Sequence, residues 1–190
     1  MPHSPLAAYV VAIALAMAGL PGSLLAAESA KVSISPAVAK AMKGVKDAAD
    51  QKKFAEVITR AKAVLALPGR TPADAFVAYQ FMTVAYQGQG NRAEMLTALQ
   101  GQLDSGYPSP AQRSQIMKNM VGIAFELKNY PKVAEYGNRL IESGGADASI
   151  YALVGHALFL QGKYANASKL LSDHVKAQIR NRQTPRDHRR

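Results

Sequence analysis

Histidine is the most versatile catalytic side chain near neutral pH, because it serves as an acid, a base or a metal ligand. This chain has four histidines, of which His3 and His188 lie near its two ends. His156 and His174 fall on two different predicted helices, and no acidic pair accompanies them at metal-ligand spacing. Asp173 is adjacent to His174 in sequence and therefore points to another side of the helix. We predict no metal site, and we expect His174 to be solvated or half-buried.

Other catalytic patterns also fail to match the sequence. Gly88-Gln89-Gly90 resembles a phosphate-binding loop only in its glycines, because no Lys-Ser or Lys-Thr pair follows it. We interpret it as a turn between helices. The chain has no cysteine, which excludes disulfides and thiolate metal sites. The sequence therefore predicts neither an enzyme nor a cofactor.

Four short segments of similar sequence divide the chain at regular intervals. They are Lys52-Lys53-Phe54, Gly90-Asn91-Arg92, Lys128-Asn129-Tyr130 and Gly162-Lys163-Tyr164. Their third members stand at positions 54, 92, 130 and 164, so the successive spacings are 38, 38 and 34. Each segment lies between two stretches in which apolar residues recur at helical spacing. This regularity indicates an internal repeat whose unit is a helical hairpin with a tight turn.

The spacing predicts helices that pair into hairpins. Their approximate ranges are 37–50 with 52–66, 72–88 with 91–104, 109–127 with 130–143, and 147–161 with 164–179. The connectors 67–72, 105–110 and 143–147 each contain glycine and then a helix-capping residue, which is typical of one helix ending and another beginning. No sustained alternation favours a sheet, and the one strand candidate is the short stretch 31–35.

The predicted fold class is all-α, an α-solenoid of about four stacked helix-turn-helix hairpins. A single hairpin cannot bury its apolar face, so the stacking of neighbouring hairpins must stabilise the fold. In the last hairpin, Gly155 and Ala167 leave room for a close approach of the two helices, and larger residues fill the space around them.

The hairpins resemble the tetratricopeptide repeat (TPR) family, whose pattern places an aromatic residue, Leu-Gly and Tyr on the first helix and Ala with a bulky residue on the second. The residues that this resemblance assigns to repeat packing are Tyr79, Tyr86, Tyr130, Tyr151, Gly155, Leu158, Tyr164, Ala167 and Leu171. The last hairpin matches best, and the first and third are degenerate. A related helical-hairpin repeat is the alternative, because two of the three spacings are longer than the usual period of the family.

The resemblance implies that the first helices of the hairpins line a concave groove that binds a peptide. The candidate residues of this face are Gln80, Val84, Gln87, Lys118, Phe125, His156 and Phe159. For Phe125 and Phe159, the alternative is a core position between hairpins. Four methionines are candidates for an adaptable binding surface, but their helical spacing favours core filling. They are Met82, Met95, Met117 and Met120.

The N-terminal segment 1–27 contains no Lys, Arg, Asp or Glu and is mainly apolar from Leu6 to Leu20. Helix-breaking residues and small residues follow, so we predict a signal peptide over 1–27, although its start lacks a basic side chain. An uncleaved leader that anchors the chain in the inner membrane is the alternative. We expect a short linker over 28–36, the TPR-like helical repeat domain over 37–179 and a basic disordered tail over 180–190.

Export without cysteine favours a bacterial periplasm. The leader followed by degenerate repeats resembles exported periplasmic TPR proteins of Gram-negative bacteria. This resemblance implies a non-catalytic interaction or scaffold module of the cell envelope that binds a protein or peptide. The alternative is a structural subunit that forms a homo-oligomer through the uncapped end of the helical stack.

The formal net charge is +10, and five arginines lie between Arg180 and Arg190. Such a tail can bind nucleic acid or an anionic surface. No aromatic residue interleaves with these arginines to stack on bases, and export also argues against nucleic acid. We therefore expect no nucleic acid partner, and membrane contact only through an uncleaved leader. The alternative to a disordered tail is that the chain is truncated from a longer repeat protein.

Overall fold

The structure is a computed structural model that describes residues 10–11 and 32–183. Eight α-helices and two very short strands make up the regular structure of these residues. The predicted all-α class is confirmed. The chain forms two compact units, one that ends at Pro108 and one that begins at Ser109.

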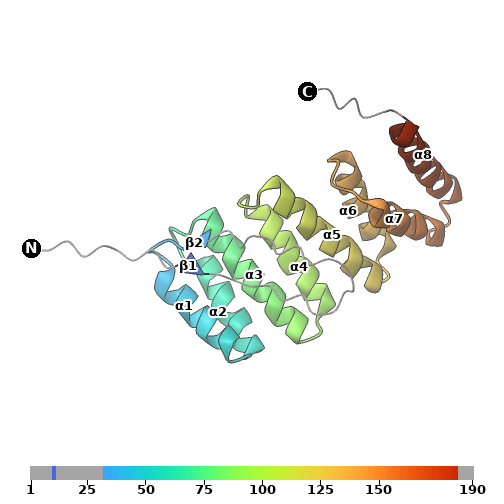
Figure 1. Cartoon of the computed structure of the whole chain (residues 1–190). Helices are drawn as coiled ribbons and strands as arrows, with labels where there is room; N and C mark the ends of the chain where they lie inside the picture. Colours follow the sequence, from blue (N-terminus) through green and yellow to red (C-terminus); the bar gives the residue numbers. More distant parts are fainter. Residues whose placement is uncertain (1–9, 12–31, 184–190) are drawn as a thin grey trace, which may run out of the picture. The chain divides into compact units, whose positions relative to one another are not determined.

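The first unit consists of two helical hairpins and a short N-terminal ladder (Figure 1). Its elements are β1 (Val10–Val11), β2 (Val32–Ser33), α1 (Ala39–Asp50), α2 (Phe54–Ala66), α3 (Pro72–Gly88) and α4 (Arg92–Asp104). Each helix packs on the next, and the first helices of the two hairpins, α1 and α3, also contact each other. Val45, Val64 and Val77 are fully buried in this unit. The two hairpins therefore share one apolar core, as stacked repeats require.

The second unit repeats this arrangement with a further pair of hairpins. Its helices are α5 (Pro110–Glu126), α6 (Tyr130–Glu142), α7 (Ala148–Leu160) and α8 (Tyr164–Gln183). Consecutive helices pack on one another, and α5 contacts α7, just as α1 contacts α3. Met120, Val133, Leu140 and Val154 are fully buried.

The four predicted turn segments share one backbone conformation. Their first residues have φ angles of 55° to 73°, and these residues are Lys52, Gly90, Lys128 and Gly162. The next residue of each segment donates its backbone N–H to a carbonyl five residues earlier, at 2.9–3.0 Å. This bond and the left-handed residue before it define the Schellman ending of a helix. The repeated turn predicted from the sequence is therefore confirmed at all four places.

Capping residues explain where several helices begin. Thr71 forms a capping box with Asp74 at the start of α3, and Ser109 forms one with Gln112 at the start of α5. A proline follows Thr71 and Ser109 in each case, at a position where a helix needs no N–H donor. Asp147 caps α7 by accepting hydrogen bonds from the backbone.

The segment predicted as a linker is partly built into the first unit. β2 lies within the strand candidate 31–35, pairs antiparallel with β1 and contacts α3. Val32 and Ile34 are buried. Except for Val10 and Val11, the predicted signal peptide lies outside the described residues.

A buried carboxylate holds this segment against α3. Asp74 is fully buried and accepts hydrogen bonds from the backbone N–H of Ser35 at 2.9 Å and its hydroxyl at 2.6 Å. Thr71 donates its backbone N–H at 2.7 Å and its hydroxyl at 2.9 Å. Burial raises the pKa of Asp74, but the hydrogen bonds from Ser35 and Thr71 outweigh it and place the pKa below its usual value.

The last helix is longer than its predicted range. α8 continues through Gln183, whereas the predicted helix ends at 179 and the predicted disordered tail begins at 180. Arg and Gln favour helices, and no proline occurs in this stretch before Pro185. The start of the predicted tail, from Arg180 to Gln183, is therefore helical, and residues 184–190 lie outside the described part of the chain.

Candidate protein-binding site

An ion pair joins the first helices of the two hairpins in the second unit. Lys118 on α5 and Asp147 at the start of α7 approach to 2.6 Å between Nζ and Oδ2. The other carboxylate oxygen accepts the backbone N–H groups of Ser149 at 3.1 Å and Ile150 at 3.3 Å. The hydrogen bond from Lys118, with a further one from Ser149, lowers the pKa of Asp147 to about 2. Lys118, a predicted face residue, thus positions α7.

Phe125 and His156 also meet where α5 contacts α7. Their ring centroids are 5.3 Å apart, and Phe125 lies edge-on to Tyr130 with a centroid distance of 5.9 Å. Phe125 is half-buried and His156 is exposed. Three predicted residues of the binding face therefore lie along one helix–helix contact, and His156 is the most accessible of them.

Phe159 lies one turn after His156 on α7 and is 57% exposed. It is not a core residue, so the alternative interpretation of this side chain is wrong. Tyr164, predicted to pack within the repeat, is 61% exposed and contacts Phe159 edge-on at 5.1 Å between ring centroids. The end of the α7–α8 hairpin thus carries an exposed aromatic pair.

The remaining predicted face residues belong to the first unit. Gln80, Val84 and Gln87 follow one another at helical spacing on α3, and each is half-buried. The other four predicted residues are on α5 and α7 of the second unit. Each unit therefore has its own candidate face.

Seven of the nine residues predicted to pack the repeats are buried or half-buried. Tyr86, Gly155, Leu158 and Ala167 are buried. The half-buried members are Tyr79, Tyr130 and Tyr151. A Cβ on Gly155 would lie 3.0 Å from the side chain of Leu171, so the missing side chain lets α8 approach α7. Leu171 itself remains 39% exposed.

The alternative roles of the methionines and of His174 are resolved by burial. All four methionines are buried, which confirms core filling, and they are Met82, Met95, Met117 and Met120. His174 is half-buried, as expected, and stacks on Tyr151 with ring centroids 3.8 Å apart. Asp173 pairs with Lys169 at 2.6 Å instead of approaching a histidine.

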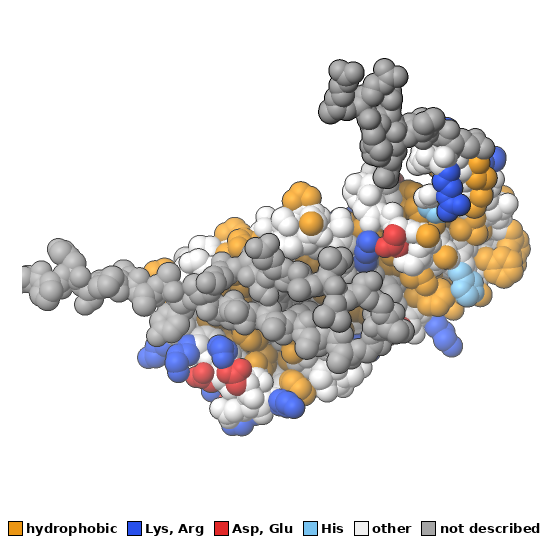
Figure 2. Space-filling view, viewed as in Figure 1, with side chains coloured by type: hydrophobic (Ala, Val, Ile, Leu, Met, Phe, Trp, Pro, Cys, Tyr) orange, Lys and Arg blue, Asp and Glu red, His pale blue; other side chains and the backbone are white. Residues whose placement is uncertain are grey.

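One apolar row on α8 was not predicted from the sequence. Tyr164, Leu171, Val175 and Ile179 are all exposed and recur at helical spacing. Figure 2 shows hydrophobic side chains at the surface of the α7–α8 hairpin, with Lys and Arg side chains among them. Tyr164 and Leu171 were predicted to pack within the repeat, and no role was predicted for Val175 or Ile179. We call these four residues the α8 row.

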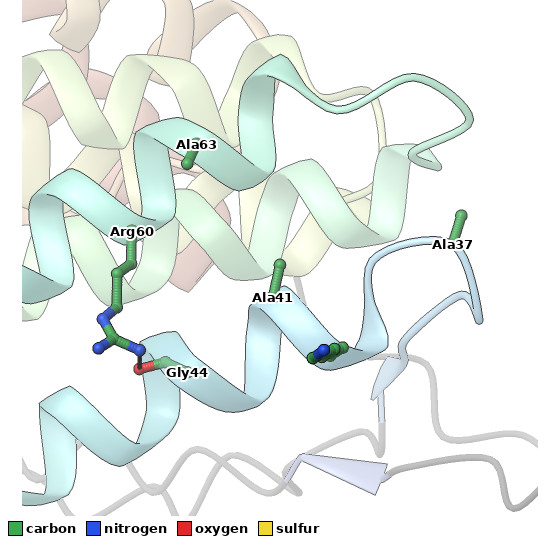
Figure 3. A pocket seen from close by; sticks show the side chains of 6 residues that line it. Ala37, Ala41, Gly44, Arg60 and Ala63 are labelled. Carbon is green, nitrogen blue, oxygen red and sulfur yellow. Dashed lines mark hydrogen bonds between the residues drawn. The ribbon is translucent and has the colours of Figure 1, made fainter.

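A shallow hollow of about 420 Å³ lies between α1 and α2 (Figure 3). Its lining consists of Ala37, Lys40, Ala41, Gly44, Arg60 and Ala63. The Arg60 guanidinium donates to the carbonyl of Gly44 at 3.3 Å and pairs with Glu56. Small side chains dominate the lining, and its guanidinium is engaged with the protein itself.

The chain has no match among protein-family models or among curated proteins. In the part of the chain that the structure describes, no group of three acidic or histidine side chains is arranged to hold a metal ion. No described helix is both long and apolar enough to cross a bilayer.

Proposed function

We propose that this protein is a non-catalytic protein-interaction module of the TPR type, which binds a polypeptide through the faces of its first helices. The observation that carries this proposal is the pairing of exposed His156 and exposed Phe159, one turn apart on α7. Phe125 contacts the same histidine from α5. Polar and aromatic groups therefore lie together on one helix face.

This combination suits a polypeptide ligand. A bound peptide needs hydrogen bonds for its backbone and apolar contacts for its side chains. The His156 ring offers hydrogen bonds to the peptide backbone, and Phe159 offers an apolar contact for a peptide side chain. The stacked hairpins hold both on helices, so binding requires little ordering of the protein.

We further propose that the protein acts in the bacterial cell envelope as an interaction or scaffold component. The apolar segment 1–27, which has no Lys, Arg, Asp or Glu, supports export, and export of a chain without cysteine favours a bacterial periplasm. The periplasm is the favoured location, and anchoring to the inner membrane by an uncleaved leader is the alternative.

A paired substitution tests the binding face. We expect Lys118→Gln combined with His156→Ala to abolish the recovery of a polypeptide partner from envelope extract. Asp147→Asn is the matched control, because it breaks the same ion pair while asparagine still caps α7. The control should retain the partner. Unchanged recovery by the double variant, with an intact circular-dichroism spectrum, would refute the proposed face.

A second candidate function is a structural subunit that forms a homo-oligomer through the uncapped end of the stack. The exposed α8 row favours it, because an apolar row of this length commonly marks an interface. Sedimentation velocity at increasing concentration separates the two functions. A chain that remains monomeric at tens of micromolar would exclude the structural subunit.

A further inference from the structure

The α7–α8 hairpin repeats the aromatic contact of the α5–α6 hairpin. The turn residues Lys128 and Gly162 both have a positive φ and lie 34 positions apart. The same shift of 34 positions relates Phe125 to Phe159 and Tyr130 to Tyr164. Both phenylalanines lie edge-on to the turn tyrosine, with interplanar angles of 63° and 62°. The two hairpins thus present equivalent aromatic pairs.

Only one of the two pairs is covered by a further helix. His156 of α7 lies against Phe125, with ring centroids 5.3 Å apart. Phe159 is 57% exposed, and no described residue takes the place of His156 beside it. The position that α7 occupies on the α5–α6 hairpin is therefore open on the α7–α8 hairpin.

The second helices of the two hairpins support this correspondence. Gly137 of α6 lies directly against Val154 and close to Ile150, both on α7. The same shift in numbering takes Gly137 to Leu171 of α8, which belongs to the exposed α8 row. Val175 and Ile179 continue the row along the helix and are 54% and 50% exposed. Hence α8 carries a large apolar side chain, Leu171, at the position that α6 uses to receive α7.

Basic side chains lie at both ends of the α8 row. Lys163 precedes Tyr164, and Arg182 lies one turn after Ile179; both are exposed. Elsewhere on α8, Asp173 is the one acidic residue and is engaged by Lys169 at 2.6 Å. An occupant of this surface should therefore be apolar along its centre and acidic at both ends.

The positive charges at the two ends of the α8 row disfavour packing of a second copy of the chain, or of the chain's own terminal segments, against it. In a second copy packed row against row, Lys163 and Arg182 meet cations in either helix direction. Residues 184–190 bring three more arginines and no large apolar side chain. The segment 1–27 contains no acidic residue. Residues 184–190 offer only Asp187 as an acidic residue, so none of these three occupants has an apolar centre with acidic ends, the pattern that the charge of the row favours.

We propose that the α7–α8 hairpin docks an amphipathic helix of a partner protein, which packs there as α7 packs on the α5–α6 hairpin. Its acidic residues lie about 28 Å apart and meet Lys163 and Arg182, because the helix between these two rises about 1.5 Å per residue. The inference rests on the proposed function, since it specifies the kind of polypeptide that the module recognises. It uses the α8 row and Phe159, whereas the paired substitution above changes Lys118 and His156.

The test uses the full chain and a labelled synthetic helix of about 20 residues, with leucine and alanine in the centre and glutamate at both ends. A second helix carries lysine in place of glutamate. Fluorescence anisotropy should show binding of the glutamate helix at least about ten-fold tighter than the lysine helix. This preference should weaken with added salt.

Two sets of variants locate the binding. Val175→Lys combined with Ile179→Lys should weaken binding at least about ten-fold, whereas Thr59→Lys combined with Asn138→Lys, which adds the same charge at exposed sites, should not. Lys163→Glu combined with Arg182→Glu should reverse the preference toward the lysine helix. This reversal does not depend on loss of folding, so a merely unfolded variant cannot produce it.

Several outcomes would overturn the proposal. These are no preference for the glutamate helix, tighter binding to phosphatidylglycerol vesicles than to that helix, and a self-association that the Val175 and Ile179 substitutions abolish. The proposed function is judged separately by the Lys118 and His156 variant. Loss of the envelope partner in that variant, together with no binding of the glutamate helix, would retain the function and reject this docking surface.

Discussion

Lys118 on α5 donates to the carboxylate of Asp147 at the first turn of α7, with 2.6 Å between Nζ and Oδ2. Asp147 therefore caps α7 and also links α7 to α5 through its ion pair with Lys118. We expect Asp147→Ala to lower the free energy of unfolding by about 1–2 kcal/mol, because the cap and the ion pair are lost together. Asp147→Asn keeps the cap and should cost less. Urea unfolding checks this, and equal losses in the two variants would contradict the capping role.

Acid should weaken this contact within a defined pH range. The pKa of Asp147 falls from its ordinary 3.8 to about 2 in the folded chain. Its stabilising contribution is therefore complete above the ordinary value and is lost as the pH falls through 3.8 toward 2. The pKa of Asp74 is also lowered, so both groups act in the same direction. Melting temperatures between pH 6 and pH 2 should fall less steeply for Asp147→Asn than for the natural chain.

Asp74 should matter more to stability than an exposed carboxylate. Asp74→Ala removes a buried carboxylate that accepts four hydrogen bonds from Ser35 and Thr71, so we expect a loss of about 3 kcal/mol. Asp47→Ala removes an exposed pair with Lys43 and should cost less than about 0.5 kcal/mol. Denaturant unfolding of both variants provides the comparison.

The contact between Ser35 and Asp74 can be isolated by a double-mutant cycle. Ser35→Ala should destabilise the natural chain by about 1 kcal/mol and have little further effect in the Asp74→Ala background. Additive losses would show that the two side chains act independently.

Gly137 allows α6 and α7 to pack closely. A Cβ at this position would collide with Val154, so we expect Gly137→Ala to destabilise the chain by about 1–3 kcal/mol. Val154→Ala makes room, and the combined variant should lose less than the sum of the two changes. Gly122→Ala is the matched control on α5, because a Cβ placed there meets nothing within 4 Å beyond the adjacent residues and the nearby backbone of its own helix. Thermal unfolding should show the control to be slightly stabilised, since alanine favours a helix.

Local chemistry made the helices and turns predictable. Thr71 followed by Pro72 indicates a helix start, and Gly90 and Gly162 favour the left-handed conformation that ends a helix. The structure has a helix start and positive φ angles at these places. Lys52 and Lys128 adopt the same conformation without being glycine, and only the repeat spacing indicated them.

Contacts between distant parts of the chain were not predictable in the same way. Ser35 and Asp74 are 39 positions apart, and no local pattern connects them. The apolar spacing of α8 showed that Tyr164 and Leu171 lie on apolar sides of a helix, but not whether another helix covers them. Exposure depends on the neighbours in space, so the α8 row became visible only in the folded chain.

The proposed function requires that a polypeptide binds the face formed by α5 and α7. A photo-crosslinking amino acid placed at position 156 in the full chain, followed by mass spectrometry of envelope extract, tests it most directly. A matched probe at Asn138, an exposed residue of α6, reports nonspecific contact. We expect a polypeptide to crosslink at position 156 and not at position 138. Equal crosslinking from both positions, or none from position 156, would contradict it.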